Sequence, residues 1–392
     1  MKVRLKPLGL PLVILAIDLG TLAGTSTAEN PPHLLDARRV PEIREALQDA
    51  INRRVIPGAV FWIEREGATL HGAVGWRAVI PKKEAMTEDT IFDLASLTKV
   101  VATTPCIMLL VEQGKIRLDA PVKTYLPEFS GEGRENITVR HLLTHTSGMK
   151  PDLPREPAWS GYATGIRKVC AVAPDHAPDV EFRYSDINFI VLGEIVHRVS
   201  GQTLDEFAKE RVFAPLGMRE TMFNPPVSLR ERIAPTERDE NQVMLRGVVH
   251  DPTARRMGGV AGHAGLFGTA ADLARYCRMI LGEGELDGVR FLKPETVRLM
   301  TSVQTPPEMK ERRGLGWDID TRFSRPRGAL FPLGSFGHTG FTGTCVWMDP
   351  FSKTFYVYLS SRLHATNPKT DSREVYDTMG TEAALCVLNW EF

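Results

Sequence analysis

The segment FDLASLTKV, residues 92–100, contains a serine and a lysine three positions apart, Ser96 and Lys99. On a helix this spacing puts both side chains on one face about one turn apart, so the amine can reach the hydroxyl. Asp93 is a candidate helix cap, which would place Ser96 in the first turn, near free backbone amides and the positive end of the helix dipole. A serine hydroxyl needs a neighbouring base to become a good nucleophile, and a desolvated lysine can be that base. The segment therefore predicts a nucleophilic serine at the start of a helix.

This spacing alone is a weak signal, because Ser147 and Lys150 share it. Gly148 and Pro151 disfavour a helix in that segment, so the second pair has no reason to share a face. We interpret Ser147 as structural. The function of the first pair then depends on its companions elsewhere in the chain.

Two other short segments could complete a site. Tyr184 stands on a short loop before a strong helical pattern, where its phenol could relay a proton between nucleophile and leaving group. His338, Thr339 and Gly340 lie on an apparent strand, where the glycine would let substrate lie against the backbone and Phe341 could contribute an amide. Three such segments in this order predict a catalytic cleft.

The pattern of apolar and polar residues divides the chain into three regions. Residues 58–76 alternate apolar and polar side chains around a Glu66-Gly67 turn, which predicts a β-hairpin. Residues 96–278 are mostly helical in pattern, with Asp186 as a cap of the helix that ends at Gly201. Residues 337–350 and 353–363 are typical of two adjacent strands, followed by a helix over 372–388. We expect an α/β (α+β) fold: one antiparallel sheet flanked by helices (residues about 37–95 and 280–392), an inserted all-helical domain (about 96–279), and a cleft at their junction.

At these motifs the sequence resembles class C serine β-lactamases, serine DD-peptidases (penicillin-binding proteins) and the SxxK carboxylesterases often called family VIII. The resemblance covers nearly the whole chain after the N-terminal leader and agrees with the expected fold. The segments that carry it are FDLASLTKV (92–100), GKIRLDAPVKTYLPEF (114–129), HLLTHTSGM (141–149), FRYSDINFIVLGEIV (182–196), GGVAGHAGLF (258–267), GLGW (314–317) and GHTGFTGT (337–344).

The resemblance implies a role for each matching residue. Ser96 would be the acylated nucleophile, Lys99 its base or proton-sharing partner, and Tyr184 the group that passes a proton to the leaving group. His338 would replace the lysine of the third motif, and the backbone amides of Ser96 and Phe341 would form the oxyanion hole. The resemblance implies neither a metal nor an organic cofactor.

One departure from the pattern concerns substrate recognition. The second motif usually reads Tyr-x-Asn, and here its third place is Asp186, with Asn188 two residues later. An asparagine can donate a hydrogen bond to a substrate amide, whereas an ionised aspartate only accepts. A carboxylate near Lys99 would also favour the charged amine and move the base role towards Tyr184. We expect this change to favour simple esters over acylamino-bearing β-lactams.

A second departure is His338, whose charge varies near neutral pH while that of a lysine does not. Binding of a carboxylate-bearing substrate would then depend on pH. Trp317, Arg362 and His364 are further candidates to line the pocket.

The N-terminus is typical of a secretory signal. Three basic residues precede the apolar run 8–17, and Ser26-Thr27-Ala28 offers small residues for cleavage. The run is too short to span a membrane. Residues 1–28 therefore predict export to the periplasm or beyond, with no stable membrane span after cleavage; an uncleaved anchor and a cytoplasmic tail are the alternatives.

Bulk properties exclude other classes. The 48 basic residues equal the 48 acidic ones, and no basic run of five or more residues occurs, so nucleic acid is not an expected partner. The five cysteines lie far apart without metal-type pairing, and we expect buried thiols with no disulfide assigned. His250, Asp251 and His263 show no metal-ligand spacing, so we expect them in loops near the cleft.

Three functions remain. The leading one is an esterase that acts on small or medium acyl esters through an acyl-enzyme at Ser96. A D-amino-acid-specific peptidase (DD-carboxypeptidase) or β-lactamase is the second, and a silent peptidoglycan-binding protein is the third. The sequence leaves the oligomeric state open.

Overall fold

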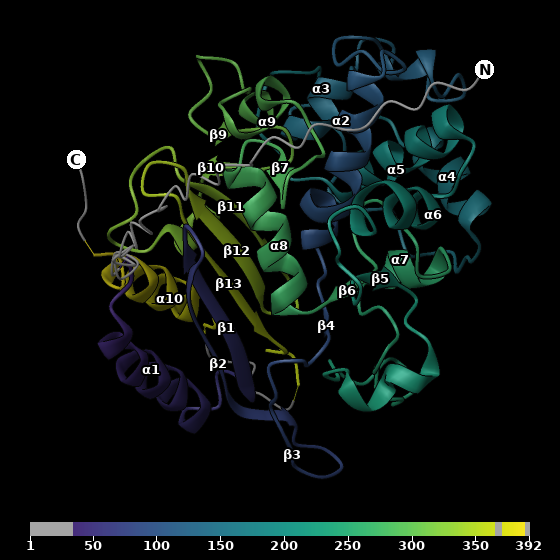
Figure 1. Cartoon of the computed structure of the whole chain (residues 1–392). Helices are drawn as coiled ribbons and strands as arrows, with labels where there is room; N and C mark the ends of the chain where they lie inside the picture. The colour runs from purple at the N-terminus through teal and green to yellow at the C-terminus, as the bar shows by residue number, and fades with distance from the viewer. Residues whose placement is uncertain (1–33, 365–370, 389–392) are drawn as a thin grey trace, which may run out of the picture. The chain divides into compact units, whose positions relative to one another are not determined.

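One antiparallel sheet joins the two ends of the chain in the computed structural model, which describes residues 34–364 and 371–388. Its strand order is β3-β2-β1-β13-β12-β11-β10-β9 (Figure 1). The strands are β1 (Gly58–Arg65), β2 (Ala68–Ala78), β3 (Glu84–Ala85), β9 (Arg312–Arg313), β10 (Asp318–Asp320), β11 (Phe336–Gly340), β12 (Thr344–Asp349) and β13 (Thr354–Ser360).

The hairpin β1–β2 confirms the first sequence pattern. Glu66 and Gly67 both adopt positive φ angles between the two strands, which a tight turn requires. β1 then pairs with β13 from Ala59↔Ser360 to Arg65↔Thr354, so residues 289 to 301 positions apart become neighbours.

The third region contains one more strand than expected. Residues 337–350 do not form a single strand, because the chain reverses at Phe341–Gly343 between β11 and β12. Gly343, with φ +111°, donates its N–H to the Gly340 carbonyl at 3.0 Å. The reversal places Phe341 at the cavity that is described in the next section.

Helices cover both faces of the sheet, as Figure 1 shows. α1 (Val40–Asn52) and α10 (Arg373–Leu385) pack on one face through a core that includes Phe61 of β1 and Tyr356 of β13. α8 (Ala270–Leu281) packs on the other face of the sheet. The core there includes Val60, next to Phe61 in β1, and Val357, next to Tyr356 in β13. Burial on both faces explains why the central strands contain almost no exposed side chains.

The middle of the chain is mostly helical and packs on the α8 side. Its helices are α2 (Thr104–Glu112), α3 (Val139–Thr144), α4 (Tyr162–Ala171), α5 (Asp186–Ser200), α6 (Leu204–Ala208) and α7 (Pro252–Arg256), followed later by α9 (Pro294–Thr301). Short helical turns are η1 (Ala37–Arg39), η2 (Lys99–Thr103), η3 (Val122–Thr124), η4 (Lys209–Phe213), η5 (Val227–Arg232) and η6 (Arg325–Arg327), of which η2 and η4 are π-helical. A small sheet also lies here, β4 (Phe92–Asp93), β6 (Leu266–Gly268) and β5 (Met222–Phe223), and β7 (Glu285–Leu286) pairs with β8 (Val289–Arg290).

The α/β fold class with an antiparallel sheet flanked by helices is confirmed. One local expectation is wrong: Ser185, not Asp186, caps α5, because its hydroxyl accepts from the Asn188 N–H. This leaves the Asp186 side chain free for the site described below. All five cysteines are buried free thiols, as expected. The subdomain boundaries stay a prediction, and the signal segment lies outside the described residues.

Candidate active site

Ser96 lies in a tight turn between β4 and the helix that contains η2. Ala95 before it has φ +46°, a left-handed conformation that costs energy for any residue with a side chain. Asp93 holds this turn through both carboxylate oxygens, accepting from the N–H groups of Ala95 (2.9 Å) and His250 (2.7 Å). Asp93 thus fixes the nucleophile turn and does not cap the helix itself.

Lys99 lies fully buried behind Ser96 at the start of the π-helical turn η2. Its Nζ donates to Ser96 Oγ at 3.0 Å and to the His263 carbonyl at 3.1 Å. The same nitrogen lies 2.7 Å from Asp186 Oδ1. Burial opposes the charge on the amine, but the Asp186 carboxylate and the Tyr184 phenol outweigh it and raise the pKa of Lys99. Lys99 is therefore an ammonium at rest.

Tyr184 covers the pair from the cleft side. Its ring centroid lies 4.9 Å from the Lys99 Nζ. The ring stacks on His145 at 4.4 Å and faces His338 at 6.0 Å. His145 is fully buried, and its Nδ1 accepts from the Ser185 N–H at 3.1 Å, which fixes the backbone beside Tyr184. Reasoning from the residues missed His145, although it lies in the HLLTHTSGM segment.

The end of β11 forms the opposite wall. A Cβ on Gly340 would lie 2.1 Å from Thr344 Oγ1 and 2.5 Å from the Leu94 carbonyl, so the glycine permits close packing of β11 on the nucleophile turn. Thr342 and Thr344 donate to the carbonyls of Asp93 and Leu94. These contacts, and not only substrate access, explain why a glycine stands there.

Ser96 and Phe341 line one cavity, and each offers a backbone amide. Among residues 34–364 and 371–388, no acceptor pairs with the N–H of Ser96 or of Phe341. Unpaired amides beside a nucleophile can receive the negative charge of a tetrahedral intermediate.

His338 is buried, with 5% of its surface exposed, and its Nδ1 lies 2.8 Å from the Thr339 carbonyl. Burial, assisted by the charges of Arg313 and Lys99, lowers the pKa of His338 well below its usual value. The expectation that this ring changes charge near neutral pH is therefore wrong. His338 enters the site as a neutral group.

A cavity of about 390 Å³ collects most of the predicted residues. Lys99 and Asp186 are not among the residues that line this cavity. Trp317 and His364 are buried and do not line the cavity, whereas Arg362 does. The lining residues are Ser96, Tyr184, Arg313, Asp318, Phe323, His338, Thr339, Gly340, Phe341, Arg362, Asp371, Ser372, Arg373 and Tyr376.

The second serine–lysine pair does not form a site. Ser147 is buried and donates to Asn188 Oδ1 at 2.6 Å, while the half-exposed Lys150 pairs with Asp175 at 3.6 Å. Asn188 is therefore engaged away from the cleft and does not substitute for the asparagine that the second motif lacks.

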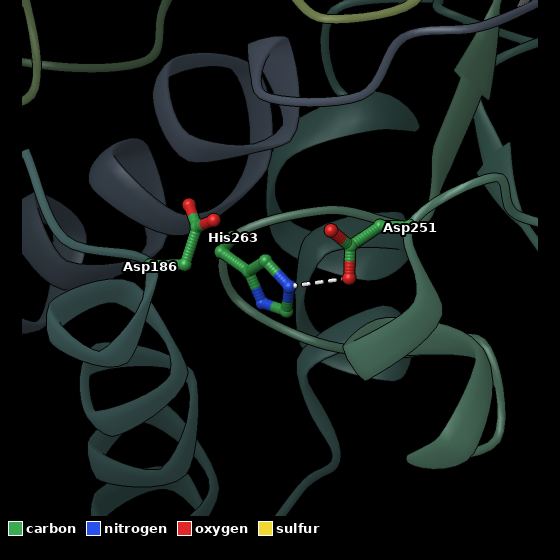
Figure 2. A group of neighbouring side chains, drawn as sticks. All are labelled: Asp186, Asp251 and His263. Carbon is green, nitrogen blue, oxygen red and sulfur yellow. Dashed lines mark hydrogen bonds and ion pairs between the residues drawn. The ribbon is translucent and has the colours of Figure 1, made fainter. Parts of the chain in front are cut away.

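Asp186, Asp251 and His263 form a group behind Lys99, with ligand atoms within 4.8 Å of one another (Figure 2); His263 is buried and the two aspartates are partly exposed. His263 Nε2 lies 2.9 Å from Asp251 Oδ1. Burial opposes the charge of the ring, but the Asp251 carboxylate outweighs it and raises the pKa of His263. The sequence placed Asp251 and His263 in loops near the cleft, and the structure brings them to Lys99.

Comparison with known proteins adds to this geometry. Residues 43–378 match the protein family described as Beta-lactamase. The chain belongs to the beta-lactamase family. It is 31% identical over 312 residues to a protein of Escherichia coli (strain K12) named "Putative D-alanyl-D-alanine carboxypeptidase", covering 71% of this chain and 70% of that protein.

Solved structures show the same fold. A penicillin-binding protein homologue from Caulobacter crescentus superposes with a TM-score of 0.71 at 23% identity, over 90% of this beta-lactamase family member and 98% of the homologue. EstCE1, a hydrolase with promiscuous acyltransferase activity, superposes with a TM-score of 0.68 at 23% identity, over 86% and 98%. This beta-lactamase family member is a serine hydrolase. No helix among its described residues is long and apolar enough to cross a membrane.

Proposed function

We propose that the protein is an exported esterase that forms an acyl-enzyme at Ser96. The observation that carries the proposal is the position of Ser96 Oγ on the cavity wall, 3.0 Å from Lys99 Nζ, with Asp186 holding that nitrogen at 2.7 Å. A carboxylate here offers no N–H to a substrate amide. Simple esters of small or medium acyl groups need no such donor.

The acylation step uses the groups that surround Ser96. Ser96 Oγ attacks the ester carbonyl carbon while its proton passes to the oxygen of Tyr184, which acts as the base beside the Lys99 ammonium. The carbonyl oxygen becomes an oxyanion that accepts from the N–H groups of Ser96 and Phe341. The bond to the leaving alkoxide then breaks, and Tyr184 returns the proton to the alkoxide.

Deacylation repeats these roles with water as the nucleophile. Water attacks the acyl carbonyl, Tyr184 takes a proton from it, and Ser96 leaves as the alkoxide that recovers this proton. The products are a carboxylic acid and the free enzyme. We expect Thr339 and Gly340, at the end of β11, to align the substrate backbone along the cavity.

Several aromatic rings support an apolar acyl or alcohol group. Tyr184, Phe323, Phe341 and Tyr376 all line the cavity, and Phe341 is 60% exposed. Exposed aromatic surface in a cavity favours ligands that bury apolar area.

The test is a turnover assay of the mature protein on p-nitrophenyl acetate, p-nitrophenyl butyrate, nitrocefin and a peptide ending in D-Ala-D-Ala. Fast ester hydrolysis that is lost in Ser96→Ala, with little turnover of the other two, is the expected result. Ser147→Ala is the matched control, because that serine belongs to the other serine–lysine pair and does not line the cavity. Ester hydrolysis that survives in Ser96→Ala would refute the proposal.

A D-alanyl-D-alanine carboxypeptidase is the second candidate. The Escherichia coli relative carries this name, and Arg362 and Arg373 line the cavity, where a guanidinium could bind a terminal carboxylate. Faster release of D-alanine from the peptide than hydrolysis of either ester would favour it. Binding of the peptide with no turnover of any substrate would instead identify a silent binding protein.

Export is part of the proposal. It is supported by residues 1–28, whose basic residues, apolar run and small residues have the pattern of a secretory signal. Detection of the protein in the periplasmic fraction, beginning after residue 28, would support it.

A further inference from the structure

The Asp186–Asp251–His263 group behind Lys99 contains a buried histidine that the proposed reaction does not use. His263 is 1% exposed, and its ring lies between the carboxylates of Asp186 and Asp251 in Figure 2. Its backbone carbonyl accepts from Lys99 Nζ at 3.1 Å. His263 therefore contacts Lys99 through its backbone carbonyl and Asp251 through its side chain.

The loop that carries His263 is held rigidly. Thr103 of η2 donates to the Gly262 carbonyl at 2.7 Å. A Cβ on Gly262 would lie 1.9 Å from the Phe189 carbonyl of α5, so the loop lies directly against that helix. Asp251, the partner of the ring, is itself fixed by accepting from the Ala254 N–H at 2.7 Å. The ring is placed by its surroundings before any substrate arrives.

One ring nitrogen is free to gain or lose a proton. Nε2 makes the contact with Asp251, while Nδ1 is buried and has no hydrogen-bond partner among the residues that the structure describes. The ring can therefore change its charge at Nδ1 without leaving Asp251. The raised pKa of His263 favours the charged form near neutral pH.

The charges around the His263 ring determine how its protonated form affects Lys99. Asp186 and Asp251 carry negative charge, and Lys99 carries positive charge within the same group. Asp152 also faces the group, donors from Leu153 and Thr253 contact its carboxylate, and burial raises its pKa. Asp93 lies near Asp251, and burial also raises the pKa of its carboxyl. An imidazolium in this place attracts Asp186 and repels the Lys99 proton.

We propose that His263, held by Asp251, is a positioning residue that acts through Lys99 and sets the pH at which Ser96 becomes reactive. The reaction needs the Lys99–Tyr184 pair to lose one proton, whichever of the two groups gives it up. A positive charge on His263 favours that loss, so the enzyme becomes active at a lower pH than it would without the charge. The inference rests on the proposed acyl transfer at Ser96.

The test is the pH dependence of kcat/KM for p-nitrophenyl acetate between pH 5 and 9. His263→Gln keeps an N–H that can reach Asp251 but removes the charge. We expect the acid limb of its profile, the rise of kcat/KM with pH, to move up by about one pH unit. At pH values on the acid side of this rise kcat/KM should then be about tenfold lower, while the plateau at higher pH should be unchanged. His263→Gln leaves the negative charge of Asp251 without its positive partner. The double variant His263→Gln/Asp251→Asn removes that negative charge as well, so its acid limb should move back towards that of the unmodified enzyme.

His197→Gln is the matched control, since His197 lies on α5 with Asp186 but at the other end of the helix and pairs with Glu194. Its limb should match that of the unmodified enzyme. A folded His263→Gln variant with an unmoved limb, or with a lower plateau and no shift, would overturn the inference. If the variant does not fold, ¹⁵N spectra of histidine-labelled enzyme give a second test, because a neutral His263 ring at pH 7 also overturns it. Ser96→Ala measured beside these variants separates the two proposals: full activity in it refutes the acyl transfer, whereas an unmoved limb refutes only the role of His263.

Discussion

The Asp186 carboxylate and the Lys99 ammonium form an ion pair at 2.7 Å beside Ser96, with the ammonium fully buried and the carboxylate partly exposed. A lysine that keeps its proton donates to Ser96 Oγ and cannot at the same time accept the proton of that hydroxyl. We therefore expect this pair to decide both which group acts as base and which substrates the cavity accepts.

Asp186→Asn should change both properties. Without the carboxylate the pKa of Lys99 falls, so the acid limb of kcat/KM for esters should move down by about one pH unit or more. The new amide can donate to a substrate amide carbonyl, and nitrocefin turnover should rise. Steady-state assays at several pH values measure both effects, with Asp49→Asn on α1 as a control on the other face of the sheet. Unchanged nitrocefin turnover would refute the role given to Asp186.

Lys99→Met should remove activity without exposing new polar surface. Proton transfer by a positioned group is worth about 10²–10⁴-fold, and kcat/KM for esters should fall by that range. Lys150→Met is the matched control, because that lysine has the same spacing from a serine but is half-exposed and pairs with Asp175. The two variants are compared in one ester assay, and equal losses in both would contradict the assignment.

His338 should make the protein sensitive to acid. Burial and two neighbouring cations lower its pKa in the folded state, while the unfolded chain binds the proton at its ordinary pKa of about 6.5. The unfolded state thus holds more protons at lower pH, so this contribution to stability is complete above about pH 6.5 and is lost as the pH falls below it. Urea midpoints at pH 7 and pH 5 measure the loss. His338→Gln should show a smaller difference between the two midpoints, and an equal or larger one would contradict a neutral buried ring.

Arg313 should be needed for stability. It is fully buried, lies 3.5 Å from Asp318 and donates to the Gly316 carbonyl at 2.8 Å. Arg313→Met would leave the buried Asp318 carboxylate without its cation, at a cost of about 3–5 kcal/mol in the free energy of unfolding. Urea denaturation measures this cost. The double variant with Asp318→Asn should recover part of it; a single variant as stable as the unmodified protein would show that the pair does not matter.

Much of the fold could be predicted from local patterns. Alternation and a Glu66-Gly67 turn predicted the hairpin β1–β2, and a cap expected at Asp186 with a terminal Gly201 predicted α5, although Ser185 is the cap. The turn at Phe341–Gly343 was missed, because its residues also suit a strand and only the pairing of β11 with β12 requires the reversal.

The part of the candidate site that could be predicted from the sequence is the part formed by residues close together in the chain. Ser96 and Lys99 are three residues apart, and the resemblance supplied Tyr184 and His338. His145, Arg313 and the Asp251–His263 pair could not be found in this way, because their roles come from contacts between segments far apart in the chain. The neutral state of His338 likewise depends on burial, which no local pattern states.

Intact-protein mass spectrometry after brief reaction with an activated ester tests the central claim most directly. The account predicts one added acyl group, mapped to Ser96 by peptide digestion, which decays as product appears and is absent in Ser96→Ala. An adduct of equal yield in Ser96→Ala, or rapid turnover with acyl transfer to another residue, would contradict it.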